Sequence, residues 1–377
     1  MSTWATHDTQ RRMSLELRAV IEALEKIAPT RHAESWDNVG LIAGDPRQQV
    51  SAALLTIDYT DEVAREREQL GCELVIAYHP PIFQAVKRLT AGSLVYDAIR
   101  SGAAIYSPHT ALDVAAGGTN DVLCDVMGVV RRSPLKLAET KSTQYKLVTF
   151  VPENALESVS EALFAAGAGR IGQYTSCSFR SPGTGTFFGE AGTNPSVGQR
   201  GRLETAQEVR VETVVPIAKI MAVIEALRKS HPYEEPAFDL NQLAAAPEGV
   251  GLGRVGEFDQ PVDRRELLER IKRGLEVSHV LVAGPTDGAV SRVAACAGAC
   301  GELVDDAIRQ KAELYLTGEM RHHDVLKAAR AGLTVVCTLH SNSERITLRR
   351  LKSRLEEALP GLAVHLSRSD RDPFEIR

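Results

Sequence analysis

Strand-like and helix-like segments alternate at both ends of the chain. In residues 51–107, short apolar runs such as ELVIAYH (73–79) alternate with polar stretches of helical length that end on glycine. Residues 291–368 repeat this pattern and include a long segment with apolar residues at helical spacing. Such alternation is typical of a parallel sheet with helices on its faces. The sequence therefore predicts a mostly parallel α/β unit built from two halves, one from each end of the chain.

The middle of the chain has a different pattern. Two passes of strand followed by helix flank residues 178–201, a segment rich in Gly, Pro, Ser and Thr. That composition is typical of a long loop or an exposed hairpin. The resulting β-α-β-β-α-β order predicts an inserted α+β domain of ferredoxin-like type. We therefore assign residues 1–140 and 257–377 to the two halves of the α/β unit, and residues 141–256 to the insertion.

Composition and charge argue against several classes of protein. The formal net charge is −5, and no long run of Lys or Arg predicts nucleic-acid binding. The N-terminus lacks the apolar segment of a signal peptide, and no stretch of about 18 apolar residues predicts a membrane span. The six cysteines lie mostly singly in apolar segments; Cys296 and Cys300 are four apart, without a second pair to complete a zinc spacing. These features predict a cytoplasmic protein with reduced, structural thiols.

Polar side chains that could bind a metal follow four of the predicted strands. In parallel sheets, ligands bind beyond the carboxyl ends of the strands. The residues at these ends are Tyr78 and His79, His109 and Asp113, Glu319 with His322 and His323, and His340 with Glu344. Imidazole and carboxylate together suit a divalent ion such as zinc, iron, manganese or cobalt. His340 and Glu344 are four residues apart, so one helical turn would place both on the same face.

Other chemistries have less support in the sequence. It has no G-x-S-x-G elbow, no phosphate-binding G-x-x-x-x-G-K-[ST] loop and no cysteine in an activating context. Backbone amides of residues 297–302 could hold an anion, although a tight turn that needs small residues explains them as well. His231 and Glu234 could bind another metal, but we expect them to pack between insertion domains. Asp37 and Asn38 are expected to organise a turn beneath the site.

Five motifs, found in order, resemble those of a known family. They are ESWDNVGLIAGD (34–45), YHPPIF (78–83), SPHTALDVAAGGTND (107–121), YLTGEMRHHD (315–324) and HSNSER (340–345). They are similar to motifs of the GTP cyclohydrolase I type 2 homologs, also called NGG-one-interacting-factor-three-like proteins. HPYEEPAFDL (231–240) resembles the PII-like or divalent-tolerance-protein-like insertion of the longer members. The resemblance implies a toroidal homohexamer with a pair of metal ions per subunit that face an internal cavity.

The resemblance also implies the metal ligands. His79 matches the second histidine of the family's His-His pair, and Asp113 matches the aspartate of H-T-x-x-D. His340 and Glu344 match the histidine and glutamate of the last motif, where the glutamate bridges both ions. Tyr78 departs from the pattern, because it stands at the first position of the pair and a neutral phenol is a poor ligand. The site would therefore hold one or two ions per subunit.

A histidine elsewhere could compensate for Tyr78. The common bacterial pattern after T-G-[DE] is tyrosine then histidine, whereas this chain has His322 then His323. We hypothesise that Tyr78 and His322 exchanged roles, so that His322 supplies the missing imidazole. This hypothesis requires the His322 side chain to lie close to His340.

Three functions remain open at this point. In a metal-dependent hydrolase, the metal would lower the pKa of a water molecule, and His109, Glu319 or His323 could move protons or orient the ligands. The cyclohydrolase name implies attack on a purine ring, but no residues indicate a pterin or guanine pocket. The alternatives are a metal-binding or metal-distributing protein whose insertion senses a small ligand, and a scaffold for a protein partner. An open coordination position would favour hydrolysis.

Overall fold

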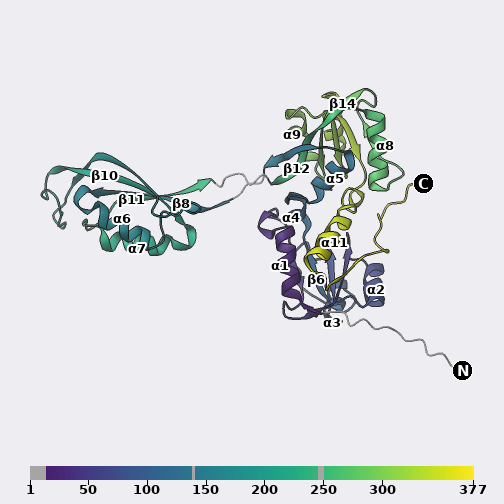
Figure 1. The fold of residues 1–377 in the computed structure, drawn as a ribbon, viewed down its shortest axis with the longest axis horizontal. Coiled ribbons are helices and arrows are strands. Elements are labelled where there is room, and N and C mark those ends of the chain that lie inside the picture. The colour runs from purple at the N-terminus through teal and green to yellow at the C-terminus, as the bar shows by residue number, and fades with distance from the viewer. Residues whose placement is uncertain (1–13, 138–140, 245–249) are drawn as a thin grey trace. The chain divides into compact units, whose positions relative to one another are not determined.

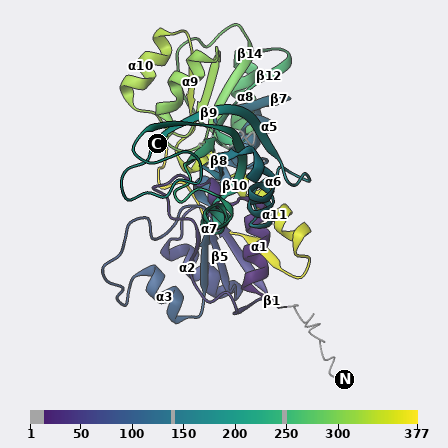
Figure 2. The ribbon, with the colours of Figure 1, turned by 90° about the vertical axis from the view of Figure 1, so that its left-hand side faces the viewer.

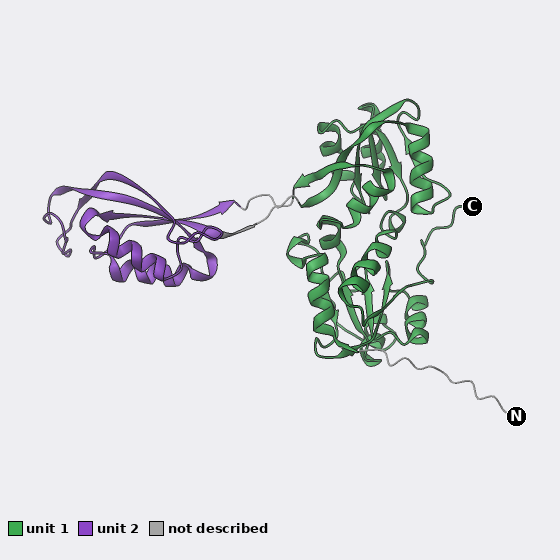
Figure 3. Cartoon of the chain, viewed as in Figure 1, with its two compact units in different colours: residues 1–139, 248–377 green, residues 140–247 purple. Residues whose placement is uncertain are grey.

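The computed structural model describes residues 14–137, 141–244 and 250–377, which form two compact units (Figure 3). Unit 1 combines residues 1–139 with 248–377, and unit 2 is the segment 140–247 between them. Residues 251–256 belong to unit 1, although the sequence pattern assigned them to the insertion. The reason is that their strand, β12 (Gly251–Asp263), pairs with two strands of unit 1.

The first sheet of unit 1 contains strands from both ends of the chain. Its order is β17-β4-β5-β6-β2. The strands are β4 (Ala52–Thr56), β5 (Leu74–Ala77), β6 (Ala104–Ser107), β17 (Ala363–Leu366) and β2 (Gly40–Ala43). All pairs are parallel except β2 with β6. Every residue of β4, β5 and β6 is buried, and this burial on both faces explains their continuous apolar sequences.

The second sheet of unit 1 is mixed. Its order is β13-β16-β15-β14-β12-β7. The strands not yet given are β7 (Arg131–Leu137), β13 (Leu281–Ala283), β14 (Ala289–Cys296), β15 (Leu314–Thr317) and β16 (Thr334–Cys337). The central strands β14, β15 and β16 are parallel, whereas β13, β12 and β7 join antiparallel. The predicted parallel strands thus form the centre of this sheet. β7 and β12 lack the continuous apolar runs by which the central strands were predicted.

Helices cover both faces of the first sheet. α1 (Leu17–Ile27) and α11 (Thr347–Ala358) pack on one face in a single apolar cluster. α2 (Asp61–Leu70) and α3 (Leu94–Arg100) pack on the other. Figure 2 shows β5 between α2 and α1. Alternate residues of each strand supply the two clusters, as expected when successive side chains point to opposite faces.

The second sheet is covered in the same way. α5 (Thr119–Met127) and α8 (Arg264–Leu275) share one cluster with the sheet. α9 (Val304–Arg309) and α10 (His322–Arg330) contribute to the cluster on the opposite face, and Figure 1 shows α9 and α8 on opposite sides of the sheet. A short helix, α4 (His109–Val114), follows β6. Within the described residues, no helix is both long enough and apolar enough to cross a membrane.

Unit 2 is a four-stranded antiparallel sheet with two helices. Its elements in chain order are β8 (Lys141–Pro152), α6 (Leu156–Ala165), β9 (Ser178–Phe188), β10 (Leu203–Pro216), α7 (Ile220–Ser230) and β11 (Phe238–Ala244). The strand order is β11-β8-β10-β9, and the core lies between the sheet and both helices. The Gly- and Pro-rich segment forms β9 and the connection to β10, with which β9 pairs from Phe188–Leu203 to Ser178–Thr213. It is thus a hairpin with a long connection.

Glu73 links the starts of β4 and β5 and provides a test of stability against pH. Its carboxylate accepts hydrogen bonds of 3.0 Å from the backbone N–H groups of Ser51 and Ala52 and from the Ser51 hydroxyl. Burial raises the pKa of Glu73, but these hydrogen bonds outweigh it and the pKa is lowered. Because the pKa is lower in the folded state, the charged form stabilises the fold at neutral pH, and this contribution disappears as the pH falls through the folded-state pKa.

We therefore expect Glu73→Gln to reduce the free energy of unfolding at neutral pH by about 0.5–1 kcal/mol, a range that allows for screening of a half-exposed group. At a pH below the folded-state pKa the difference between the two proteins should vanish, because the parent carboxyl is then protonated. Urea denaturation at both pH values measures this. Equal losses at the two pH values would show that the charge of Glu73 is not the cause.

Candidate metal centre

Three side chains of unit 1 form a group that could hold a metal ion. His79, His340 and Glu344 each offer one ligand atom, and these atoms lie within 4.8 Å of one another. His79 follows β5, His340 follows β16, and Glu344 follows the 3-10 turn η5 (Ser341–Ser343). The group therefore joins the carboxyl ends of parallel strands from the two halves of the chain, as the positions of the polar residues predicted.

The carboxylate of Glu344 faces both histidines. Its Oε2 lies 3.2 Å from Nε2 of His79, and its Oε1 lies 3.4 Å from Nε2 of His340. Both His79 Nε2 and Glu344 Oε2 are buried, and neither makes a hydrogen bond. A buried polar atom without a hydrogen bond costs about 1–3 kcal/mol. A divalent cation bound between these atoms would satisfy both, so the residues present fit a metal ion.

Carboxylates orient both histidines. Asp58 Oδ1 lies 2.9 Å from Nδ1 of His79, and Glu319 Oε1 lies 2.8 Å from Nδ1 of His340. A metal-binding histidine usually bonds its second ring nitrogen to such a group, which fixes the ring and its tautomer. Glu319 was predicted to have an orienting or proton-moving role, whereas Asp58 was not predicted from the sequence. The position of Asp58 just after β4 was a usable signal, since the other strand-end residues were found by the same rule.

A proton competes with a metal ion at His79. Burial lowers the pKa of this imidazole, but its hydrogen bond to Asp58 and its close contact with the charge of Glu344 outweigh burial and raise the pKa to about 10. A metal ligand must be deprotonated at the coordinating atom. Metal binding at this group should therefore weaken as the pH falls.

Tyr78 and Asp113 contact each other beside this group. The Tyr78 side chain is fully buried, and its hydroxyl donates a short hydrogen bond to Oδ1 of Asp113 and lies 2.8 Å from Oγ1 of Thr119. Burial and the charge of Glu344 raise the pKa of Asp113 to about 6. Asp113 is therefore close enough to interact with Glu344, but its carboxylate is engaged by a phenol rather than by a second histidine.

His109, the first residue of α4, lies next to the group and has a strained backbone conformation. Its φ is +24°, and its ring centroid is 5.3 Å from that of His79. Asp37 Oδ1 lies 2.7 Å from Nδ1 of His109, and Asp37 Oδ2 also accepts the Thr110 N–H at 3.1 Å. Asn38 donates from its side chain to Ile82 O at 2.6 Å. Asp37 and Asn38 thus organise the turns around the site.

His322 and His323 lie elsewhere. Both are exposed on the first turn of α10, where their ring centroids are 5.4 Å apart. Among the described residues, the three-ligand group of His79, His340 and Glu344 includes neither His322 nor His323. The buried residue of α10 is Ala328, near the C-terminal end of the helix, whereas the first turn is exposed to solvent. The structure therefore does not bring His322 into the group, as the hypothesis of exchanged roles required.

A glycine turn after β14 packs against the ligands. Gly298 has φ +70°, and a Cβ at this position would lie 2.9 Å from Oε1 of Glu344 and 3.4 Å from Nε2 of His340. We expect Gly298→Ala to weaken metal binding by about 10- to 100-fold, as for other residues that contact metal ligands. Competition with a fluorescent zinc chelator measures this affinity.

Gly332→Ala is the matched control for Gly298→Ala. Gly332 has a similar φ of +79°, but a Cβ there would meet nothing within 4 Å. Both substitutions strain a left-handed backbone residue, and only the first introduces an atom against the ligands. If both variants lost metal affinity equally, backbone strain rather than the shape of the site would be responsible.

A cavity of about 340 Å³ opens beside His79. The segment after β5 and the start of α3 line it, with Asp58 at one side. Most of its lining is apolar, and Arg88 is the only arginine or lysine among the lining residues. Trp36 and Phe83, which are 58% and 52% exposed, lie near His109 with ring centroids 6.0 and 6.4 Å from it. The arrangement provides room for a small molecule next to the metal-binding group.

The motif HPYEEP of unit 2 does not form a second metal site. Nε2 of the buried His231 lies 3.0 Å from Phe150 O, and its Nδ1 accepts the Tyr233 N–H at 3.0 Å. Both ring nitrogens are thus used within the fold. Glu234 is exposed and accepts the Asn194 N–H at 3.1 Å. This supports a packing role for His231 within unit 2.

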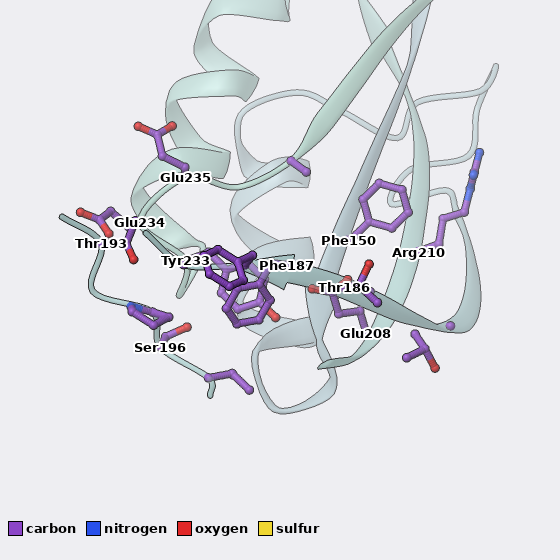
Figure 4. A pocket seen from close by; sticks show the side chains of 18 of the residues that line it. Phe150, Thr186, Phe187, Thr193, Ser196, Glu208, Arg210, Tyr233, Glu234 and Glu235 are labelled. Atoms are coloured by element: carbon purple, nitrogen blue, oxygen red, sulfur yellow. The ribbon is translucent and has the colours of Figure 1, made fainter. Parts of the chain in front are cut away.

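Unit 2 contains a larger cavity of about 570 Å³ between the β9 hairpin and the HPYEEP segment (Figure 4). Aromatic rings of Phe150, Phe187 and Tyr233 line it together with hydroxyl groups of the hairpin and the carboxylate of Glu208. None of its lining residues belongs to the group of His79, His340 and Glu344, so the larger cavity does not coincide with the candidate metal centre.

Comparison with known proteins gives consistent matches over nearly the whole chain. The sequence profile of the family described as Duf34/NIF3 (NGG1p interacting factor 3) matches residues 15–373. A relative in Halalkalibacterium halodurans, named GTP cyclohydrolase 1 type 2 homolog, is 36% identical over 346 residues, which are 91% of this chain and 92% of the relative. A Bacillus subtilis protein of the same name is 35% identical over 96% of this chain and 98% of that protein.

Solved structures are similar over the same length. A Bacillus cereus protein related to NIF3 is 33% identical, with a TM-score of 0.67, over 98% of this chain and 100% of that protein. A Staphylococcus aureus protein is 26% identical, with a TM-score of 0.76, over 96% of this chain and 99% of that protein.

Proposed function

The chain belongs to the Duf34/NIF3 (NGG1p interacting factor 3) family, and from this premise we propose that it is a divalent-metal-binding protein that acts as a metal-dependent hydrolase. The observation that carries the proposal is the pair of buried atoms without hydrogen bonds, His79 Nε2 and Glu344 Oε2, which face each other at 3.2 Å. His340 adds a third ligand. Three protein ligands with a position left open are typical of catalytic rather than structural zinc sites.

The residues around the group have distinct roles in this proposal. A bound zinc, iron, manganese or cobalt ion would lower the pKa of a water molecule and so supply a nucleophile near neutral pH. Asp58 and Glu319 orient His79 and His340. His109, whose Nδ1 is held by Asp37, is the candidate to move a proton through Nε2. A substrate would occupy the cavity beside His79.

The number of ions depends on Tyr78. A second ion at Asp113 would have to displace the Tyr78 hydroxyl from the carboxylate it contacts. We therefore expect elemental analysis of untagged protein to find about one ion per chain in the parent and about two in Tyr78→His, where an imidazole replaces the phenol. Tyr78→Phe, the matched control, removes the hydroxyl without adding a ligand and should keep about one ion.

The outcomes separate the parts of the proposal. Two ions in the parent would show that Tyr78 does not limit the site. No ion in any variant, after incubation with each of the four metals, would overturn the metal-binding function itself. Hydrolysis is tested separately, on protein loaded with metal, by measuring metal-stimulated cleavage of a chromogenic carboxylic or phosphoric ester. We expect His109→Gln to lose turnover but to keep its metal. Loss of metal from His109→Gln would contradict its assigned role.

We propose further that unit 2 is a ferredoxin-like insertion. Its β-α-β-β-α-β order and its antiparallel sheet β11-β8-β10-β9 support this. The cavity of about 570 Å³ favours the alternative function, in which a non-catalytic metal-binding protein senses a small ligand through its insertion. Binding of a ligand to a protein that lacks His340 would separate this function from hydrolysis.

The homohexamer and the cytoplasmic location are also proposals. Phe179, Leu203 and Met221 of unit 2 are 66%, 71% and 78% exposed, which supports association through this unit. Light scattering of the purified protein would give the subunit number. The cysteines in the described part of the chain are free thiols, as expected in a reducing compartment.

A further inference from the structure

Cys296 and Cys300 lie on the turn that packs against the metal ligands. Cys296 is buried at the end of β14, while Cys300 is partly exposed after the turn. Their Sγ atoms are 2.6 Å apart, and Sγ of Cys300 lies 3.0 Å from Ala297 O. The Tyr315 hydroxyl donates to Cys300 O at 2.8 Å and so fixes the second cysteine from the sheet. Two thiols held this closely need only a small movement to bond.

The residues between the cysteines connect them to the metal centre. The Gly298 N–H donates to Oγ of Ser343 at 2.8 Å, and Ser343 lies in the turn between His340 and Glu344. Gly298 O accepts the backbone N–H of Glu319 at 3.0 Å, and the Glu319 side chain in turn orients His340. The turn therefore positions both ligands that come from the C-terminal half of the chain.

We propose that Cys296 and Cys300 are a site of reversible disulfide formation that regulates the metal centre, an inference that rests on the proposed metal-binding function. The bond fixes the turn that positions His340 and Glu344, and a bound ion is then released more slowly. In the part of the chain that is described, neither thiol belongs to a group of three or more potential metal ligands. The pair is therefore suited to thiol oxidation rather than to binding an ion of its own.

The oxidant is a hydroperoxide, and the reaction with hydrogen peroxide balances. Sγ of the more accessible Cys300 attacks one peroxide oxygen, the O–O bond breaks, and a sulfenic acid and one water form. Sγ of Cys296 then attacks the Cys300 sulfur, the S–O bond breaks, and the second water leaves with the remaining thiol proton. Two thiols and one peroxide thus give one disulfide and two waters. A dithiol reductant reverses the step by disulfide exchange.

The first measurement is peptide mass spectrometry of the full chain after treatment with hydrogen peroxide. We expect a linkage of Cys296 to Cys300, reversed by dithiothreitol and absent in Cys300→Ser. Cys177→Ser is the matched control, because Cys177 is also partly exposed but lies in unit 2. This variant should form the linkage like the parent. Absence of the linkage in the parent would overturn the inference, whatever its metal content.

The second measurement is the release of zinc to 4-(2-pyridylazo)resorcinol from loaded protein. We expect release to be slower by about tenfold in the oxidised form, the size of effect that residues around metal ligands usually have. Cys300→Ser should release zinc at one rate with and without peroxide. A linkage that leaves the rate unchanged would overturn the regulatory role. A reduced parent that binds no zinc would instead overturn the proposed function, while the linkage itself would still be detected.

Discussion

Glu344→Gln is expected to remove metal binding and to leave the fold intact. Glu344 supplies the only carboxylate of the three-ligand group, its side chain is 3% exposed, and it faces Nε2 of both histidines. Glutamine keeps the size of the side chain but removes the charge that holds the cation. We expect affinity for zinc to fall by more than about 100-fold, beyond the range of substitutions that only contact ligands. Competition with a zinc chelator measures the loss.

The fold should tolerate this substitution because the repulsion between Glu344 and Asp113 offsets the ion pair that Glu344 makes with His79. The charge of Glu344 helps to raise the pKa of Asp113 to about 6, which means that the two carboxylates repel each other. Circular dichroism should therefore show native Glu344→Gln without metal. If the variant instead unfolds, its metal loss says nothing about ligation, and His340→Ala, whose side chain is 40% exposed, becomes the deciding variant.

Two further glutamates provide matched controls. Glu319→Gln should reduce affinity by about 10- to 100-fold, because Glu319 only orients His340. Glu357→Gln, exposed on α11, should leave affinity unchanged. Equal effects of Glu344→Gln and Glu319→Gln would contradict the distinction between a ligand and an orienting residue.

The positions of His79, His340 and Glu344 were partly predictable because all three residues follow strand ends. The buried runs of β4, β5, β15 and β16 are visible in the sequence, and parallel strands bring their carboxyl ends to one edge. That rule would also have given Asp58, which directly follows the run that contains β4. However, β5 and β16 belong to different sheets, so the meeting of His79 with His340 and Glu344 also depends on the packing of the two sheets in unit 1, which the rule does not give.

Contacts that depend on side-chain direction were not predictable in the same way. His322 is only three residues from Glu319 in sequence, yet it lies on an exposed helical turn outside the group. The engagement of Asp113 by Tyr78 joins residues 35 positions apart. The antiparallel strands β7 and β12 lack continuous apolar runs, so the mixed character of the second sheet was equally hidden.

Arg254 is the most connected buried cation of unit 1 among the described residues. It is 2% exposed, and its guanidinium bonds both oxygens of Asp121 at 2.9 and 3.2 Å. It also donates to four backbone carbonyls, those of Gly251, Gly253, Val114 and Ala115. Two of these carbonyls end α4, the helix that carries Asp113. Strand β12 is thereby tied to the N-terminal half of the unit.

Arg254→Met is therefore expected to reduce the free energy of unfolding of unit 1 by about 3–5 kcal/mol, because it leaves a buried carboxylate and several carbonyls without their partner. Trp36 lies in unit 1, and the sequence of unit 2 contains no tryptophan, so urea unfolding followed by fluorescence reports on unit 1. Arg132→Met is the matched control, since Arg132 also pairs with Asp121 at 2.9 Å but is 27% exposed. Its loss should cost about 1 kcal/mol, as for a partly exposed ion pair. If both variants lose the same free energy of unfolding, then the burial of Arg254 and its hydrogen bonds to the α4 carbonyls do not determine the loss of stability.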